Sequence, residues 1–489
     1  MLSMLSFYAG IKMHQSGEVR HLRNRLIQSF HPVDWFRFHF GTEKEKIVLD
    51  IKQEDFQRIA YQRERALING LHFPQAGDWV PAGIQNERDS IPIKIRLKGT
   101  NSAHWKHKRK WSYSIRVRGE HTFWGMKRFT LQDPSTRHFI YEWLFMEALK
   151  REGLLVSRFE FLNLTVNGDD HGVYALEEHY DRRLIENNAL REGAIIGFNK
   201  DLAVLSWMRA FQMSDFSPSM LTEGDGFWAS SVEGSQIDSH VRGSAEFKQF
   251  QKAVTLLESF RRSEKSASEV FDIEQMAKLM AIRAFFGSLT FDWRNMKFYF
   301  NPVTARLQPV DQEVRPGKLD DNWWLNDSNA ERHNDLIRFL FRDPTFYLRY
   351  VSELKKVSDP LFLENLLETR KTEFERNLRI LYFGHWEHHD FRFSREMFTQ
   401  NQKRIRSVLN PIKGGHAYLE FLERGKLGLV FGNLQPLPVK IVGISGQSVS
   451  ETLPSKETVI AGREGKMLRY EPIEFEIPAD LDFSDEFVS

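Results

Sequence analysis

Two short runs between residues 91 and 118 alternate apolar and basic side chains, and together with a third short run at 127–131 they constrain the fold most strongly. Residues 91–98 place Ile or Leu at every odd position, with Lys or Arg at 94, 96 and 98. Residues 113–118 repeat the alternation, and residues 127–131 form a third short run that begins with two basic residues. Successive side chains of a strand point to opposite faces. The runs therefore predict strands of one antiparallel sheet with a buried face and a cationic face.

The basic residues are concentrated in this part of the chain. Residues 94–128 contain eleven Lys or Arg and one acid, a net charge of +10, whereas the whole chain carries only +2. Such a segment favours an anionic partner, and a solvated basic face is the plain structural alternative. Polyphosphate and nucleic acid both remain candidate partners. Four interleaved aromatic residues would suit base stacking: Trp105, Trp111, Tyr113 and Trp124.

Composition and missing motifs exclude several function classes. The chain has 489 residues, 41% of them hydrophobic, which suits a folded protein with an ordinary core. It has no cysteine, so a thiol nucleophile, a disulfide scaffold and a Cys-ligated metal are excluded. No GxSxG, Walker A or GxGxxG sequence occurs, and the histidines lack the usual metal-site spacing.

The pattern along the chain predicts an α+β fold in four parts. Residues 1–44 are expected to be a helical extension and 45–180 an antiparallel β-rich lobe. One helix, from the Asp133-Pro134 cap to Gly153, is inserted in that lobe, and Asn167-Gly168 marks a hairpin. Residues 181–410 are expected to be mostly helical, and 411–489 a small β appendage. The expected helices of the third part are 245–262, 272–286, 333–356, 360–380 and 394–408.

A predicted hairpin in the helical part carries the most informative polar residues. Asp292 and Asn295 precede the strand 297–300, and the returning strand 306–310 leads into Asp311. A two-stranded hairpin brings its ends together, so these oxygens could surround one divalent cation, as phosphoryl transfer requires. Capping and turn roles are the alternative interpretation.

Two further groups could bind phosphates. The turn Gly99 to Ser102 after the first basic strand can offer amides and hydroxyls. Lys127 precedes a helix that contains Glu142, and kinases use a strand lysine paired with a helix glutamate to fix a nucleotide. An ordinary amphipathic helix with solvated acids is the alternative for Glu142.

The ordered set of motifs resembles the spore-coat protein H (CotH-type) atypical kinases over about residues 45–410. The family's basic strands and G-x-K strand match residues 96–102, 110–115 and 125–131, and its early helix glutamate matches Glu142. The family's hairpin motif matches 167–178, and its Asp/Asn loop and W-D-x-D segment are similar to 292–295 and 310–313.

This resemblance implies a protein-kinase-like bilobal fold and an ATP- and Mg²⁺- (or Mn²⁺-) dependent Ser/Thr protein kinase. A coat or surface protein would be its substrate. The implied roles follow the matched positions: Asp292 as catalytic base; Asn295, Asp311 and Glu313 as metal ligands; Lys127 on the α/β-phosphates, oriented by Glu142; Glu178 near the adenine; and Arg96, Lys98 and Ser102 over the phosphates.

Two departures from the family pattern keep other functions open. Val310 stands where the family has Trp, and Glu313 where it has a second Asp. A nucleotide-binding pseudokinase or scaffold is therefore an alternative, and a nucleic-acid-binding protein using the basic sheet is a less favoured one. No signal peptide or membrane span is expected, which favours the cytoplasm, while the resemblance adds a coat or surface association.

Overall fold

A computed structural model describes most of the chain, which divides into two compact units. The first unit comprises residues 1–144, 158–179 and 367–393, and the second comprises 145–157, 180–366 and 394–489. The described residues are 45–86, 89–199, 224–235, 244–288, 295–310, 313–319, 335–384, 391–411, 413–423, 425–435, 438–445, 452–463 and 468–477.

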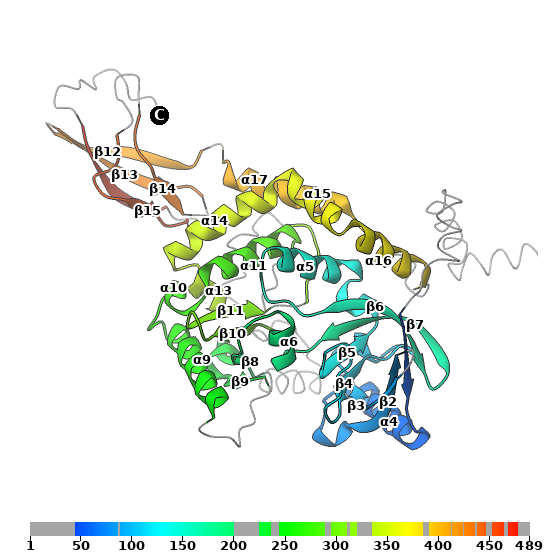
Figure 1. Ribbon diagram of the computed structural model, residues 1–489. Coiled ribbons are helices and arrows are strands. Elements are labelled where there is room, and N and C mark those ends of the chain that lie inside the picture. The colour runs from blue at the N-terminus through cyan, green and yellow to red at the C-terminus, as the bar shows by residue number, and fades with distance from the viewer. Residues whose placement is uncertain are drawn as a thin grey trace, which may run out of the picture. The chain divides into compact units, whose positions relative to one another are not determined.

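The first unit is built around a closed β-barrel of seven described strands (Figure 1). In spatial order they are β1 (Lys46–Asp50), β2 (Val80–Asn86), β3 (Asp89–Leu97), β4 (Tyr113–Val117), β5 (Arg128–Gln132), β7 (Asp169–Glu178) and β6 (Phe159–Val166). Neighbouring strands are antiparallel except for the parallel pair of β1 and β6. The three predicted basic strands are confirmed, but the sheet closes on itself, which alternation alone did not indicate.

The apolar residues of these strands fill the barrel, and the basic ones lie on its other face. Ile93, Ile95 and Ile115 are at most 1% exposed. Cross-strand register aligns Lys94 with Arg116 and then Arg116 with Arg128. Burial of the apolar set therefore fixes a row of cations across three adjacent strands.

Two helices accompany the barrel strands in the chain. Helix α4 (Gln53–Asn69) ends at Gly70, whose φ of 69° gives a left-handed cap. The single helix predicted after Asp133 is wrong in detail. A 3₁₀ turn (Pro134–Arg137) comes first and α5 (Ile140–Arg151) follows, because His138 and Phe139 adopt φ values of 53° and 58°, outside the helical region.

The second unit contains a four-stranded sheet and most of the helices. The sheet order is β11 (Arg306–Val310), β10 (Lys297–Asn301), β8 (Ile195–Phe198) and β9 (Val232–Gly234), all antiparallel. The predicted hairpin of β10 and β11 is confirmed. The short helices are α6 (Arg182–Asn187), α8 (Gly224–Ala229), α10 (Ala267–Val270) and α13 (Asp335–Leu340). The longer ones are α9 (Ala245–Arg261), α11 (Ile273–Phe285), α14 (Pro344–Ser358) and α17 (Arg395–Leu409).

Two helices expected as continuous are each broken in two. The 333–356 helix becomes α13 and α14, because Asp343 caps the second by accepting the Thr345 N–H at 2.9 Å and Pro344 lacks a donor. The 360–380 helix becomes α15 (Pro360–Thr369) and α16 (Lys371–Gly384). Helix α11 packs against α14 and α17 within the second unit (Figure 1).

The C-terminal region is β-rich, as its sequence predicts. Strands β12 (Gly415–Glu423), β13 (Lys426–Asn433) and β16 (Tyr470–Glu476) form one sheet, and β14 (Val439–Ile441) pairs with β15 (Thr458–Ile460). A small apolar cluster that includes Leu427, Ile460 and Phe475 lies at its centre. Within the described ranges, no helix has the length and apolarity to cross a membrane.

Candidate phosphate-binding face and metal-ligand pair

The cationic barrel face carries a compact charge network around Glu177, which we call the Glu177 cluster. Its members are Lys98, Gln132, Arg137 and Glu177. The Glu177 Oε2 atom accepts from Arg137 Nε at 3.1 Å, from Lys98 Nζ at 3.4 Å and from the Gln132 amide. Lys98 Nζ also donates to Gln132 Oε1 at 2.7 Å. The network thus joins the residue after β3 to β5, β7 and the 3₁₀ turn before α5.

Glu177 is ionised although its side chain is only 4% exposed. Burial alone would raise the pKa of Glu177, but the charges of Arg137 and Lys98 and the Gln132 hydrogen bond hold it at about 2. Its second oxygen, Oε1, is buried and has no hydrogen-bond partner among the described residues. A buried acceptor without a partner is costly, so this oxygen is suited to a donor from a ligand or water.

A second set of cations lies further along the same face. The guanidinium carbons of Arg96 and Arg116 lie 4.5 and 4.2 Å from the centre of the Trp79 ring. Burial and the neighbouring Arg116 lower the pKa of Arg96 to about 10, against the opposing effect of Asp78. Asp78 itself pairs with Arg65 at 2.8 Å. This part of the face therefore holds positive charge close together, an arrangement that an anion would stabilise.

In the structure the predicted lysine, Lys127, pairs with a backbone carbonyl. Lys127 lies in the bend before β5, and its Nζ donates to the Gly119 carbonyl 2.5 Å away, in the hairpin between β4 and β5. Glu142 is fully buried in the first turn of α5 and is not a partner of Lys127. Lys98 is the lysine that reaches a buried glutamate, and that glutamate is Glu177.

The other predicted nucleotide-binding residues occupy defined positions. Ser102 begins a 3₁₀ turn in the loop between β3 and β4, and its carbonyl accepts from the Lys106 N–H at 2.8 Å. Glu178 ends β7, is 2% exposed, and accepts the Arg158 N–H at 3.3 Å. Because successive strand residues face opposite ways, the side chains of Glu177 and Glu178 lie on different faces of the barrel wall.

The β10–β11 hairpin brings two of the predicted metal ligands together. Asn295 Nδ2 donates to Glu313 Oε2 at 3.2 Å, across 18 positions of sequence. Glu313 has a φ of 69°, in the left-handed region that costs a residue with a Cβ about 1–2 kcal/mol. Amide and carboxylate oxygens are ligands that Mg²⁺ accepts. Asp292 and Asp311 lie outside the described residues, and the described part of the chain contains no cluster of three His, Asp or Glu side chains suited to a metal.

The base-stacking role expected of the interleaved aromatics is wrong for three of the four. Trp105, Trp111 and Tyr113 are 2%, 8% and 0% exposed and belong to the barrel core. Trp124 is half-buried and packs against the same core. Buried rings offer no platform to a base, so these residues give the nucleic-acid alternative no support.

Sequence reasoning assigned no role to Glu177, Arg137, Gln132 and Trp79. One signal was available for Glu177: the alternation along β7 sets it on the face opposite Leu176, which is fully buried. Its pairing with Thr130 then aligns it with the basic strands. That register is a property of the folded sheet, and the linear motif does not contain it.

Comparison with known proteins gives one family match and weak structural likenesses. The family model described as CotH kinase protein matches residues 95–411. A Shewanella oneidensis MR-1 HipA–HipB–operator DNA complex is 14% identical, with 77% of this chain and 85% of that chain covered, at a TM-score of 0.22. The Helicobacter pylori proinflammatory kinase CtkA is 11% identical, with 60% and 94% covered, at 0.19. Both scores are too low to establish a common fold, and no curated protein matches.

Proposed function

The chain belongs to the CotH kinase protein family, and from this premise we propose an atypical protein kinase with a protein-kinase-like bilobal fold. It transfers the γ-phosphoryl group of ATP to a Ser or Thr hydroxyl of a protein substrate. The observation that carries the proposal is the Glu177 cluster, in which a barrel lysine is held by a buried, ionised glutamate. Kinases position a nucleotide-binding lysine in this way.

We assign the phosphate-binding lysine to Lys98 and its orienting acid to Glu177. The Lys98 side chain is 16% exposed, and its ammonium donates to three acceptors, Thr130 Oγ1, Gln132 Oε1 and Glu177 Oε2. Arg96 and Arg116 add fixed positive charge on the same face. Preorganised cations of this kind stabilise the charge that develops on a transferring phosphoryl group. The family-implied roles of Ser102 over the phosphates and of Glu178 near the adenine are kept, whereas Lys127 and Glu142 become the less favoured pair.

In the second unit, the hairpin carries the residues that we propose as metal ligands. Asn295 and Glu313, with Asp311, would hold Mg²⁺ or Mn²⁺, which neutralises the phosphates when bound. Asp292 acts as the base. The acceptor oxygen forms its bond to the γ-phosphorus as the bond to the bridging oxygen breaks, the hydroxyl proton passes to Asp292, and ADP leaves. The Asn295 amide nitrogen lies 3.2 Å from Glu313 Oε2, so the two side chains are neighbours, and each has an oxygen of the kind that Mg²⁺ accepts.

A direct experiment tests this function. The purified full chain is incubated with radiolabelled ATP and Mn²⁺ or Mg²⁺, alone and with a coat- or surface-type acceptor protein, and labelled Ser and Thr are identified. The expected result is metal-dependent label in wild type and a loss of about a hundredfold or more in Asp292→Ala, as for removal of a general base. Equal label in both proteins would contradict the proposal.

One observation favours a pseudokinase as the second candidate. Glu313 replaces the family's aspartate and sits on a strained backbone, and its longer side chain shifts the ligand position. Binding of ATP without transfer would appear as thermal stabilisation by ATP and Mn²⁺ with no label in any protein. Stabilisation together with label would instead support the kinase.

A further inference from the structure

The segment that begins at Glu313 is held by hydrogen bonds from two distant parts of the second unit. Its Arg315 N–H donates to Ser288 Oγ at 2.8 Å, and its Gly317 N–H donates to the Phe286 carbonyl at 3.0 Å. The Leu319 N–H donates to Asn401 Oδ1 at 2.9 Å. Three alternate backbone donors of this segment are therefore fixed by residues after α11 and on α17.

The Asn401 side chain also donates hydrogen bonds to this part of the molecule. Its Nδ2 donates to the Phe285 carbonyl at 3.1 Å and to the Gly317 carbonyl at 2.9 Å. The side chain is 1% exposed and uses both its donor and its acceptor ends. One buried amide thus joins the end of α11, the segment 313–319 and α17. Buried groups that are fully satisfied in this way specify a single geometry.

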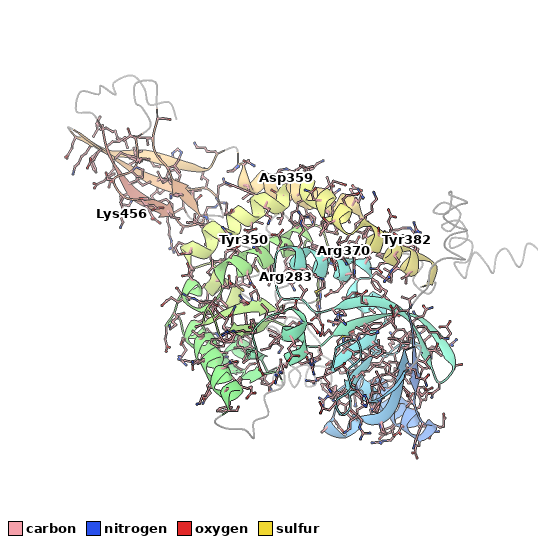
Figure 2. The ribbon with its side chains drawn as sticks, viewed as in Figure 1. Arg283, Tyr350, Asp359, Arg370, Tyr382 and Lys456 are labelled. Atoms are coloured by element: carbon pink, nitrogen blue, oxygen red, sulfur yellow. The ribbon has the colours of Figure 1, made fainter. Side chains whose placement is uncertain are left out.

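The backbones at Gly287 and Gly317 are in close contact, which restricts movement of the segment 313–319. Gly287 has a φ of 66°, and a Cβ at that position would lie 1.9 Å from the Gly317 carbonyl oxygen. Only glycine fits both the conformation and the contact. Arg283, labelled in Figure 2, donates to Ser288 Oγ at 3.3 Å and so braces the same turn.

We propose that Asn401 is a positioning residue for the metal site. It holds residues 313–319 in register so that the Glu313 carboxylate meets Asn295. This inference rests on the proposed function, since it assigns Asn401 a purpose only if Glu313 ligates a cation. Glu313 lies two residues before the first anchored amide, so its strained φ is maintained by the anchors that follow it.

The next residue of α17 provides a matched control. Gln402 is 2% exposed, and its Nε2 donates to the Val357 carbonyl at 3.1 Å and to the Asp359 carbonyl at 2.5 Å. Asp359, labelled in Figure 2, caps the end of α14 and has no bond to 313–319. Asn401→Leu and Gln402→Met each remove one similarly buried amide, but only the first removes hydrogen bonds to the segment 313–319.

The experiment compares these variants and Ser288→Ala in two measurements on the full chain. Mn²⁺ affinity is measured by electron paramagnetic resonance with a non-hydrolysable ATP analogue, and hydrogen exchange is measured for a peptide that spans 313–319. Asn401→Leu is expected to weaken Mn²⁺ binding by about tenfold, as loss of an outer-shell partner does, and to speed exchange. Gln402→Met is expected to change Mn²⁺ affinity by less than about twofold. Ser288→Ala removes a single anchor and is expected to fall between the two.

The outcomes separate this inference from the proposed function. Wild type that binds no Mn²⁺ with the nucleotide would overturn both. Wild-type binding with equal Mn²⁺ affinity in Asn401→Leu and Gln402→Met would overturn only the inference and leave Asn401 with a purely structural role. If Asn401→Leu does not fold, Ser288→Ala is compared with Gln402→Met in its place. Equal Mn²⁺ affinity and equal hydrogen exchange in these two variants would overturn the inference.

Discussion

The Glu177 cluster and the Asn295–Glu313 pair satisfy their acidic groups in opposite ways. One oxygen of Glu177 is shared by an arginine, a lysine and an amide of the protein, and the pKa of the residue is held at about 2. Glu313 Oε2 accepts from the Asn295 amide at 3.2 Å, and the Glu313 backbone is left-handed. The first network pairs its acid with cations of the protein, whereas the second joins an amide and a carboxylate side chain, whose oxygens Mg²⁺ accepts.

This difference suggests that the Glu177 cluster contributes mainly to stability and the Asn295–Glu313 pair mainly to function. A buried acid with two cationic partners stabilises the folded barrel and holds Lys98 at a fixed position. A strained residue at the end of a hairpin persists because its surroundings impose it, and such positions concentrate at functional sites. We therefore expect substitution of Glu177 to alter folding most and substitutions in the second network to alter Mn²⁺ binding most.

The largest expected effect tests the first half of this contrast. Glu177→Gln keeps the side-chain shape but removes the buried negative charge that pairs with Lys98 and Arg137. Loss of one partner of a buried pair costs about 3–5 kcal/mol of unfolding free energy. Denaturant unfolding followed by tryptophan fluorescence measures it. Glu313→Gln, the matched change in the hairpin, is expected to cost less than about 1 kcal/mol, and equal costs would abolish the contrast.

Acid titration sharpens the same point. The pKa of Glu177 falls from 4.5 to about 2 on folding, so its contribution is fully present above pH 4.5 and is lost as pH falls toward 2. The size of this contribution is on the order of 3 kcal/mol. Unfolding free energy measured between pH 6 and 3 should fall more steeply for wild type than for Glu177→Gln. If the unfolding free energies of the two proteins depended on pH in the same way, the partners of Glu177 would not lower its pKa.

Nucleotide affinity distinguishes the two candidate lysines. Lys98→Met removes an ammonium that the cluster holds in place, and a charge-assisted bond contributes about 1.5–3 kcal/mol, which corresponds to a tenfold to hundredfold loss of ATP affinity. Lys127→Met removes only a bond to the Gly119 carbonyl and should change affinity less than about twofold. Isothermal titration with ATP and Mn²⁺ measures both. The reverse order would restore Lys127 to the phosphates.

The smallest expected effect on stability concerns Glu313. Glu313→Gly relieves the left-handed strain, which offsets glycine's greater chain entropy, so the free energy of unfolding should change by no more than about 1 kcal/mol. The same substitution removes a proposed ligand and should weaken Mn²⁺ binding. Paired unfolding and Mn²⁺ titrations make the measurement. Undiminished Mn²⁺ affinity would remove Glu313 from the metal site.

Much of the local structure could be predicted, and the failures have local causes. The basic strands, the Asn167-Gly168 hairpin and the β10–β11 hairpin follow from alternation and turn residues, and the structure confirms them. The long helices failed where the backbone leaves the helical region, at His138 and Phe139, or where a new cap begins, at Asp343. Periodicity alone does not detect such breaks, because apolar spacing continues across them.

The roles of the site residues stay predictions, and the structure describes only some of their contacts. The motif order brought Asn295 and Glu313 into one hypothesis, and the structure places them in contact. The same reasoning assigned the α/β-phosphates to Lys127 and not to Lys98, because Lys127 is closer in sequence to the helix that contains Glu142. Glu177 is 79 residues from Lys98 in sequence but lies within 3.4 Å of it. Cross-strand pairing decides such a distance, and a linear motif carries no record of pairing.

The sequence alone determined which residues are strand-like, which face of each strand is cationic, and to which family the motifs point. These properties depend on the two-residue period of an extended chain and on local turn chemistry. Only the tertiary structure decided that the sheet closes into a barrel, that β1 and β6 pair in parallel, and that Glu177 receives Lys98 and Arg137. Those contacts join distant segments, and their selection depends on register and on the burial of the whole core, which no local pattern specifies.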